Sequence, residues 1–184
     1  KNWLDRQGGY EDYINAVIKA FDKNIKGVDV NKFDQIVKKV IAFHKNRLYR
    51  FTRDLIKKLK KQNYFLLAIS HSPLFIVGRF AKKIGFQKVY GRVLEVKNNK
   101  LTGKTLYEDL IFDKSKILKR AIEKENLTLK KSIGVGDTES DISFLKIVER
   151  QICFNPNKKL YNYAKKHNWR IVVERKDVIY QLNT

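Results

Sequence analysis

Apolar residues recur at intervals of three and four through the first third of the chain, which is the pattern of amphipathic helices. This spacing predicts helices over residues 10–21, 30–45 and 52–61. No run typical of a strand occurs before residue 63. The opening third is therefore predicted to be helical.

The pattern changes at residue 64, where a short continuous apolar run begins. The run YFLLAI at 64–69 is typical of a buried parallel strand. Ser72 and Pro73 predict the start of the next helix, with Ser72 as N-cap and Pro73 as first helical residue. This helix is expected to stop near Gly85. Beyond it, the apolar residues around Asn98 and Asn99 predict a β-hairpin that covers residues 93–104.

Helices and strands alternate through the rest of the chain. The patterns predict strands at 132–135, 151–154 and 169–173, and helices at 114–124, 141–147 and 158–167. Such alternation is typical of an α/β domain with a mostly parallel sheet.

Composition excludes several classes of protein. Hydrophobic residues make up 43% of the 184 residues, which excludes wholesale disorder. No apolar run reaches the roughly 18 residues of a membrane-spanning helix, and we expect a cytoplasmic protein. The single cysteine, Cys153, excludes an internal disulfide and a multi-thiolate zinc site. Composition leaves the oligomeric state open.

The net charge of +21 is spread along the chain rather than gathered in a tail. Most lysines fall on the polar side of helical patterns, so a solvated surface explains them. The same charge also produces a positive field that attracts anions, either phosphorylated metabolites or nucleic acid. Composition does not separate these interpretations.

Polar residues with chemical potential follow three of the predicted strands. Ser70 follows the strand at 64–69, the segment GDTESD at 136–141 follows the strand at 132–135, and Asn155 follows the strand at 151–154. The carboxyl ends of parallel strands are where open α/β sheets bind ligands. Lys114 begins a helix between the first two of these segments.

These residue types suit phosphoryl transfer. Asp137 and Asp141 lie four residues apart across a strand-to-helix turn, a spacing that suits Mg²⁺. Ser70 offers a hydroxyl beside backbone N–H groups, and Lys114 offers a compact positive charge. Each residue alone is more often a cap, a turn residue or a solvated charge. Their order at successive strand ends favours Mg²⁺-dependent phosphoryl transfer.

The order of motifs resembles the haloacid dehalogenase superfamily, in its phosphoserine-phosphatase-like branch (subfamily IB). The resemblance covers roughly residues 30–175. The matching stretches are LLAISHSP (66–73), VLEVKNNKLTGK (93–104), DKSKILKRAI (113–122), SIGVGDTESDISFL (132–145) and ICFNPNKKLYNYAKKHNW (152–169).

The resemblance implies an α/β fold. It implies a Rossmann-like three-layer core with a mostly parallel sheet, plus a small helical cap and a β-hairpin. The cap would comprise residues 1–50 and be incomplete at its N-terminus. The core would comprise residues 51–184 and lack its first strand.

The resemblance also implies roles for individual residues. Ser70 would hydrogen-bond the phosphoryl group, and Lys114 would steady the nucleophile and the phosphoryl charge. Asp137 would bind Mg²⁺, and Asp141 would support the metal or its waters. His71 stands where the family more usually has a small residue. We count it among the candidate substrate-binding residues with Ser70 and Lys114, although a turn role is favoured for it.

One feature of the family is missing from the sequence. The nucleophile of the family lies in a DxDx[TS] loop after the first strand, and Asp5 is the only weak candidate. The chain begins at Lys1 and contains no methionine, so we expect that the nucleophile segment precedes Lys1. The other explanation is a degenerate member of the family that performs no chemistry.

Two functional hypotheses follow. The first is a Mg²⁺-dependent phosphatase that forms an aspartyl-phosphate and acts on a small phosphorylated substrate. In this hypothesis the 184-residue chain alone is inactive. The alternative is a catalytically inert protein of the same fold that binds a phosphorylated or nucleic-acid polyanion.

Overall fold

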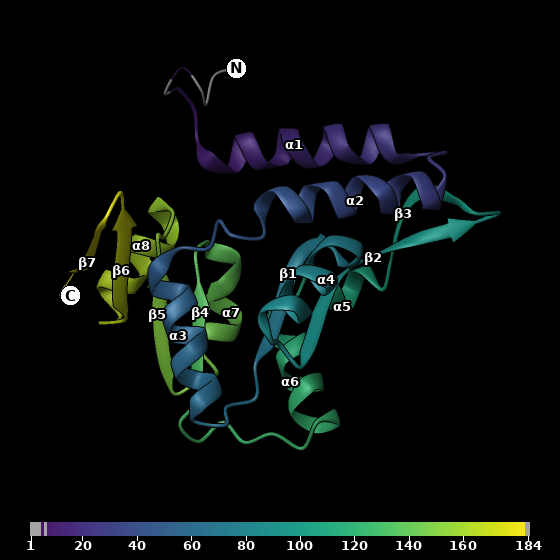
Figure 1. Ribbon diagram of the computed structural model, residues 1–184. Coiled ribbons are helices and arrows are strands. Elements are labelled where there is room, and N and C mark those ends of the chain that lie inside the picture. Colours follow the sequence, from purple (N-terminus) through teal and green to yellow (C-terminus); the bar gives the residue numbers. More distant parts are fainter. Residues whose placement is uncertain (1–4, 6, 183–184) are drawn as a thin grey trace.

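Two antiparallel helices lie across the rest of the molecule in the computed structural model, which describes residue 5 and residues 7–182 (Figure 1). Helix α1 (Tyr10–Ile25) carries two carboxylates in its first turn, which complement the helix dipole. Helix α2 (Val30–His44) begins at Asp29, whose carboxylate accepts hydrogen bonds from the backbone of Asn31 and Lys32. No helix in the described part of the chain is long and apolar enough to cross a membrane.

The α1–α2 pair is fastened to a β-hairpin formed by β2 (Lys88–Lys97) and β3 (Lys100–Leu106). The backbone N–H of Gly27 donates to the carbonyl of Leu101 at 2.7 Å, and that of Val30 donates to Asn99 at 2.9 Å. A hydrophobic cluster joins the same elements; its buried members are Ile25, Phe33, Val37, Leu94 and Leu101. The helices therefore rest on the hairpin as one packed unit.

The strands form two sheets. In the first, β1 (Leu67–Pro73) runs parallel to β2, and β2 runs antiparallel to β3. In the second, β4 (Ile133–Gly136), β5 (Arg150–Phe154) and β6 (Arg170–Arg175) are parallel, and β7 (Val178–Leu182) is antiparallel to β6. The predicted α/β class with mostly parallel pairing is confirmed.

The two sheets share one hydrophobic core although β1 and β4 do not pair. Within the described residues, β1 and β4 are each the outermost strand of their sheet. Leu67 and Ile69 of β1 nevertheless pack against the cluster that contains Leu145 and Cys153. Strand β1 thus shares a core with the second sheet although it is not hydrogen-bonded to β4.

Helices cover both faces of the second sheet. Phe51 and Leu55 of α3 (Arg50–Lys61) pack on the face that presents Ile152 and Phe154. The other face, which presents Cys153, packs against three helices; these are α6 (Lys114–Lys124), α7 (Ile142–Leu145) and α8 (Lys158–Lys166). Because alternate residues of a strand face opposite ways, one apolar strand supports both layers. This is the expected three-layer arrangement.

The segment after Ser70 differs from its prediction. Strand β1 continues through Pro73, which pairs with Arg92, and α4 (Leu74–Ile84) begins one residue later. Ser72 is therefore a strand residue, and the prediction of Ser72 as N-cap and Pro73 as first helical residue is wrong. The register is irregular between Ile69 and Pro73, but the renewed pairing of Pro73 with Arg92 keeps the chain extended and outweighs the local capping preference. The predicted end of α4 is confirmed, because Gly85 has φ 101° there.

Several shorter differences concern element boundaries. The predicted helix at 141–147 is shortened to α7 and preceded by a 3₁₀ turn at Glu139–Asp141. The short helix α5 (Glu108–Ile111) and the strand β7 were not predicted. The hairpin turn was predicted correctly, with positive φ angles at both Asn98 and Asn99.

Candidate active site

The turn after β4 is organised around the carboxylate of Asp141. Its Oδ2 accepts hydrogen bonds from the backbone N–H of Asp137 at 2.8 Å and of Thr138 at 3.1 Å. Gly136 makes this close approach possible, because a Cβ there would lie 2.5 Å from Cβ of Asp141. The side chain of Asp141 is therefore buried within its own turn.

Lys114 reaches Asp141 from a different element. It is the first residue of α6, which Asp113 caps by accepting hydrogen bonds from Ser115 and Lys116. Lys114 is buried, and its ammonium group donates to Oδ1 of Asp141. Because both charges are buried, each needs the other to offset its desolvation. The structure thus brings together two predicted site residues that lie 27 positions apart.

Asp137 is the carboxylate of the turn that a cation can reach. Its side chain is exposed, whereas both oxygens of Asp141 are engaged by Lys114 and the turn amides. The protein atoms that crowd the Asp137 carboxylate raise its pKa, and the charge of Asp141 raises this pKa further, against the effect of Lys114. A bound cation would offset the unfavourable free energy of keeping the Asp137 carboxylate ionised next to Asp141.

The oxygen ligands of the turn suit Mg²⁺ better than a metal that needs three or more protein side chains. No group of three or more His, Cys, Asp or Glu side chains suited to a metal occurs within the described residues. This excludes a metal cage made of such side chains from that part of the chain. Mg²⁺ commonly takes one or two carboxylates and keeps several waters. Asp137, with Asp141 behind it, fits that ion.

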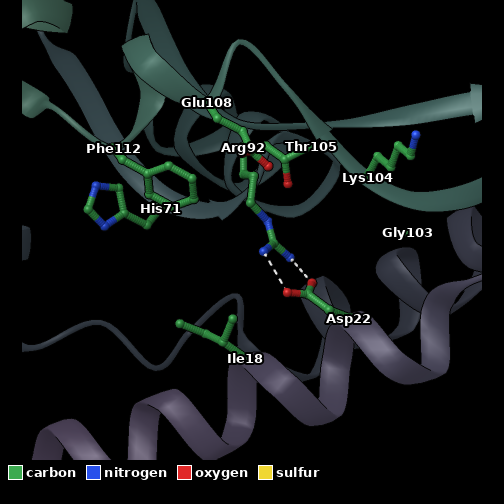
Figure 2. Close-up of a pocket in the computed structure, with 9 residues that line it drawn as sticks. All are labelled: Ile18, Asp22, His71, Arg92, Gly103, Lys104, Thr105, Glu108 and Phe112. Carbon is green, nitrogen blue, oxygen red and sulfur yellow. Dashed lines mark hydrogen bonds and ion pairs between the residues drawn. The ribbon is translucent and has the colours of Figure 1, made fainter.

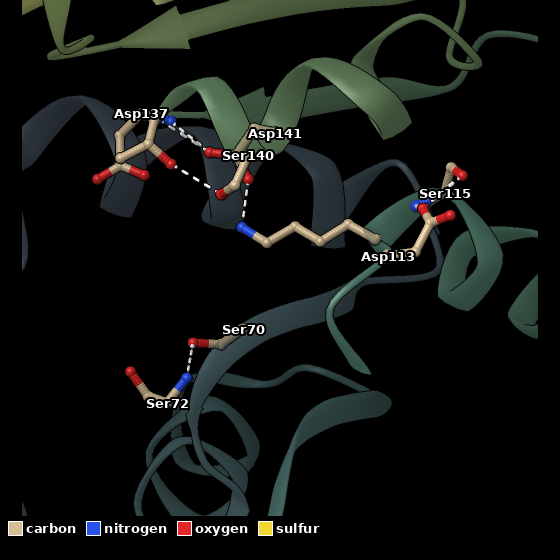
Figure 3. Close-up of polar contacts among 9 residues, drawn as sticks. Ser70, Ser72, Asp113, Ser115, Asp137, Ser140 and Asp141 are labelled. Carbon is tan, nitrogen blue, oxygen red and sulfur yellow. Dashed lines mark hydrogen bonds and ion pairs between the residues drawn. The ribbon is translucent and has the colours of Figure 1, made fainter. Parts of the chain in front are cut away.

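Ser70 is the central residue of β1, so it lies within the strand rather than after it as predicted, and it faces the aspartates across the site (Figure 3). Its Oγ accepts a hydrogen bond from the backbone N–H of Ser72 at 3.1 Å. This contact fixes the oxygen and leaves the hydroxyl proton available to a ligand. Figure 3 shows Ser70 and Ser72 on one side, and Asp137 and Asp141 on the other.

His71 was expected to be a turn residue, but it lies in β1 and its side chain lines a pocket. The pocket has a volume of about 500 Å³, within the usual range for small-molecule sites, and α1 forms one wall through Ile18 and Asp22 (Figure 2). The His71 ring lies 5.6 Å from the ring of Phe112. Burial lowers the pKa of His71, and the charge of Lys114 lowers it further, against the effect of Asp141. The imidazole is thus neutral at pH 7. It lies within electrostatic reach of both Lys114 and Asp141.

The charges that line the pocket cancel. Asp22 and Glu108 contribute two negative charges, and Arg92 and Lys104 contribute two positive charges. The guanidinium of Arg92 is already paired with Asp22. The positive charge of the whole chain is therefore not concentrated in this pocket.

Two sequence candidates lie outside this arrangement. Asn155, which follows β5, uses its side-chain oxygen to accept from the backbone N–H of Glu174 at 2.8 Å, so it links β5 to β6. Asp5 is exposed in a turn before α1. Within the described residues, neither side chain is hydrogen-bonded to or ion-paired with Asp137, Asp141 or Lys114. 

Sequence reasoning missed the residues that support the Asp137 turn from outside. The backbone N–H of Asn157 donates to the carbonyl of Asp137 at 2.8 Å, and its side-chain amide donates to Glu139. Lys159 contacts Glu139 at 3.5 Å and also pairs with Glu11 of α1. The one available signal was Asn157 as the N-cap of a predicted helix; the contacts with α1 have no local signature.

The first turn of α1 also lies within electrostatic reach of the site. The pKa of Tyr10 is raised by burial, and then by the charge of Asp137. Because Glu11 binds Lys159 beside the same turn, this end of α1 stands next to the candidate cation site.

Comparison with known proteins points to one family. Residues 7–146 match the model of haloacid dehalogenase-like hydrolases. A phosphoserine phosphatase of Methanocaldococcus jannaschii is 26% identical over 166 residues, which cover 82% of this chain and 76% of that protein. A phosphoserine phosphatase of Archaeoglobus fulgidus is 24% identical over 143 residues; the match covers 76% of this chain but only 39% of that protein.

Solved structures give the same answer for the fold. A phospho-aspartyl intermediate analogue of phosphoserine phosphatase has a TM-score of 0.65 at 25% identity, covering 89% of this chain and 73% of that chain. An apo form of phosphoserine phosphatase has a TM-score of 0.66 at 25% identity, covering 90% and 80% respectively.

Proposed function

The chain belongs to the haloacid dehalogenase-like hydrolase family, and from this premise we propose that it is the greater part of a Mg²⁺-dependent phosphatase of small phosphate monoesters. The observation that carries the proposal is the buried Lys114–Asp141 pair, which supports an accessible carboxylate at Asp137. Phosphoryl transfer needs a cation, a positive side chain and hydrogen-bond donors around one phosphorus atom. Those groups come from β1, from the first residue of α6 and from the turn after β4.

Asp137 would hold the Mg²⁺ ion, and Asp141 would keep the Asp137 turn in place. When bound, Mg²⁺ supplies positive charge that offsets the charge on the phosphoryl oxygens. Lys114 adds its own charge next to the same turn. The Ser70 hydroxyl, with its oxygen held by Ser72, donates a hydrogen bond to a phosphoryl oxygen.

The nucleophile is proposed to come from a segment outside the 184 residues, since they contain no DxDx[TS] motif. Two features of the sheet support this. No residue of β1 is fully buried, and Val135 in the middle of β4 is 37% exposed. Within the described residues, β1 and β4 each lie at the edge of their sheet. An additional strand between them would pair with both edges, join the two sheets and end beside Ser70 and Asp137.

The proposed reaction has two steps. An aspartate of that strand attacks phosphorus, so an O–P bond forms to the carboxylate while the bond to the substrate alcohol breaks. The departing alkoxide takes a proton from a general acid. Water then attacks the phosphorus of the aspartyl-phosphate and gives a proton back to the residue that acted as general acid. The bond between phosphorus and the carboxylate oxygen breaks, which releases inorganic phosphate and regenerates the carboxylate. Ser70 and Lys114 contact the phosphoryl group in both steps.

The pocket beside His71 is proposed to receive the organic part of the substrate. Its charges cancel, which favours an organic part without large net charge. Phosphoserine is the first substrate to test, because the curated relatives are phosphoserine phosphatases. The alternative function, inert binding of a polyanion, has only the net charge of +21 in its favour.

The test is phosphate release by the product of the full gene, with phosphoserine and p-nitrophenyl phosphate as substrates. We expect Mg²⁺-dependent turnover, and a loss of at least about a hundredfold in Asp137→Asn because the cation site is removed. Asp54→Asn, an exposed carboxylate on α3, is the matched control and should retain activity. The 184-residue chain alone should release no phosphate.

Two results would contradict the proposal. One is the absence of Mg²⁺-dependent turnover of either substrate by the full gene product. The other is equal activity of Asp137→Asn and the wild type. Tight binding of nucleic acid without any turnover would favour the alternative function instead.

A further inference from the structure

Helix α1 forms one wall of the pocket, and the ion pairs that hold its two ends to the rest of the protein differ in how buried they are. Its carboxyl-terminal half contributes Ile18 and Asp22 to the pocket, and the loop after it hydrogen-bonds to the β2–β3 hairpin. Its first turn instead reaches the surface around the Asp137 turn through Glu11. The contacts at the two ends differ in burial.

The contact near the carboxyl-terminal end is the ion pair of Arg92 with Asp22 (Figure 2). The two terminal nitrogens of the guanidinium donate to the two carboxylate oxygens, at 2.8 and 3.3 Å. The Arg92 side chain is only 7% exposed, and its guanidinium lies 5.3 Å from the ring of Phe21. Two parallel hydrogen bonds and a ring contact fix the orientation of α1 as well as its distance from β2.

Arg92 is also directly connected to the strand that carries Ser70 and His71. Its backbone pairs with Pro73 at the end of β1, and its side chain lines the same pocket as His71. Arg92 therefore joins α1 to the strand next to the phosphoryl-binding residues. A displacement of the guanidinium would shift the pocket wall relative to the Ser70 hydroxyl.

The contact at the other end is weaker. Lys159 pairs with Glu11 and Glu139, but the side chains of Lys159 and Glu11 are 61% and 54% exposed. Exposed ion pairs of this kind are screened by water and salt. The first turn of α1 can therefore separate from the core more easily than the segment around Asp22.

We propose that Arg92 is a positioning residue of the phosphatase: through Asp22 it sets the distance of α1 from the phosphoryl site, and so the size of the pocket for the organic part of the substrate. Lys159 provides the releasable contact at the opposite end of α1. This inference rests on the proposed function, but concerns residues that neither the metal site nor the phosphoryl contacts include.

The first experiment measures steady-state kinetics of the full gene product with p-nitrophenyl phosphate. Asp22→Asn and Arg92→Leu should raise KM about tenfold and leave kcat within about twofold, since the phosphoryl contacts persist while the pocket wall moves. Arg92→Lys keeps the charge without the paired hydrogen bonds and should lie in between. A loss confined to kcat, or wild-type kinetics in Asp22→Asn, would overturn the proposal.

The matched control is Asp34→Asn. Asp34 of α2 pairs with Arg79 of α4, so this variant also removes an ion pair between the helix pair and the core. Neither Asp34 nor Arg79 lines the pocket beside His71. KM should stay at the wild-type value; a rise equal to that of Asp22→Asn would show a general loss of packing and overturn the proposed role.

Amide hydrogen exchange provides a readout that needs no activity. Asp22→Asn should increase exchange along residues 10–25, whereas Lys159→Gln should increase it only in the first turn of α1. Equal exchange patterns in the two variants would contradict the unequal fastening. If the wild type released no phosphate, the proposed function would fail while this measurement still decided the role of the Arg92–Asp22 pair.

Discussion

The imidazole of His71 is held beside the ring of Phe112 and within electrostatic reach of the Lys114 ammonium. Its Nε2 is buried and has no hydrogen-bond partner among the described residues. A second proton on this ring would place a cation close to Lys114 while the Nε2 atom is shielded from water. The neutral form is therefore the one that the folded protein accommodates.

This environment predicts a loss of stability in mild acid. The folded pKa of His71 lies below its ordinary value of 6.5, so the unfolded chain takes up the proton first as the pH falls. Stability is present above pH 6.5 and is lost as the pH falls from there through the folded pKa. The free energy of unfolding of wild type should therefore decrease between about pH 7 and about pH 5, measured by urea titration.

His71→Gln should show a smaller decrease over the same interval, because the titrating group is gone. His44→Gln, an exposed position on α2, is the control and should follow wild type. A decrease as large in His71→Gln as in wild type would show that other groups cause the acid sensitivity.

At the scale of elements, α3 takes its N-terminal cap from a distant strand. Its N-cap residue Tyr49 makes no side-chain capping bond. Instead the carboxylate of Glu174, buried on β6, accepts from the backbone N–H of Arg50 at 3.0 Å and of Phe51 at 2.9 Å. A carboxylate at a helix N-terminus also interacts favourably with the helix dipole.

Removing that carboxylate should destabilise the protein. Glu174→Ala should lower the free energy of unfolding by about 2 kcal/mol, because two N–H groups of the first turn lose a charged acceptor. Glu125→Ala, which removes a surface partner of Lys88, should cost less than about 1 kcal/mol. Urea denaturation of both variants gives the comparison, and equal losses would contradict the capping role.

The same helix shows which parts of the fold the sequence can predict. The start of α6 was predicted correctly at Lys114, since its cap is the preceding residue, Asp113. The start of α3 was predicted two residues late, since its cap lies 124 positions further along the chain. Helix boundaries set by neighbouring residues can be predicted from the sequence, whereas boundaries set by tertiary contacts cannot.

The candidate site divides in the same way. Lys114 and Asp141 occur in motifs whose order along the chain predicts their meeting at the strand ends, and the structure brings them into contact. Asp22 and Arg92 lie 70 positions apart on a helix and a strand, without any motif around them. Only the packing of α1 against the hairpin joins them, so helical periodicity alone did not reveal the pair.

At the scale of the whole molecule, the charge of +21 acts on stability more than on the pocket. The pocket charges cancel, so the excess lies on the remaining surface. On α3, for example, Lys57, Lys58 and Lys61 are exposed. Like charges spread over a compact surface repel one another, which favours the expanded unfolded chain.

Salt should therefore stabilise this protein. Raising NaCl from about 20 mM to about 300 mM shortens the range of electrostatic interactions to a few ångströms. It weakens the many repulsions among 40 basic and 19 acidic residues more than it weakens exposed ion pairs, which contribute less than about 1 kcal/mol each. The free energy of unfolding should rise by about 1 kcal/mol across this interval, as measured by urea titration at constant pH.

Replacing Lys57, Lys58 and Lys61 by Gln should raise the free energy of unfolding at low salt and reduce its dependence on salt. A fall in stability with added salt would mean that pairs such as Lys159–Glu11 outweigh the repulsion, and that the net charge has little energetic consequence for the fold.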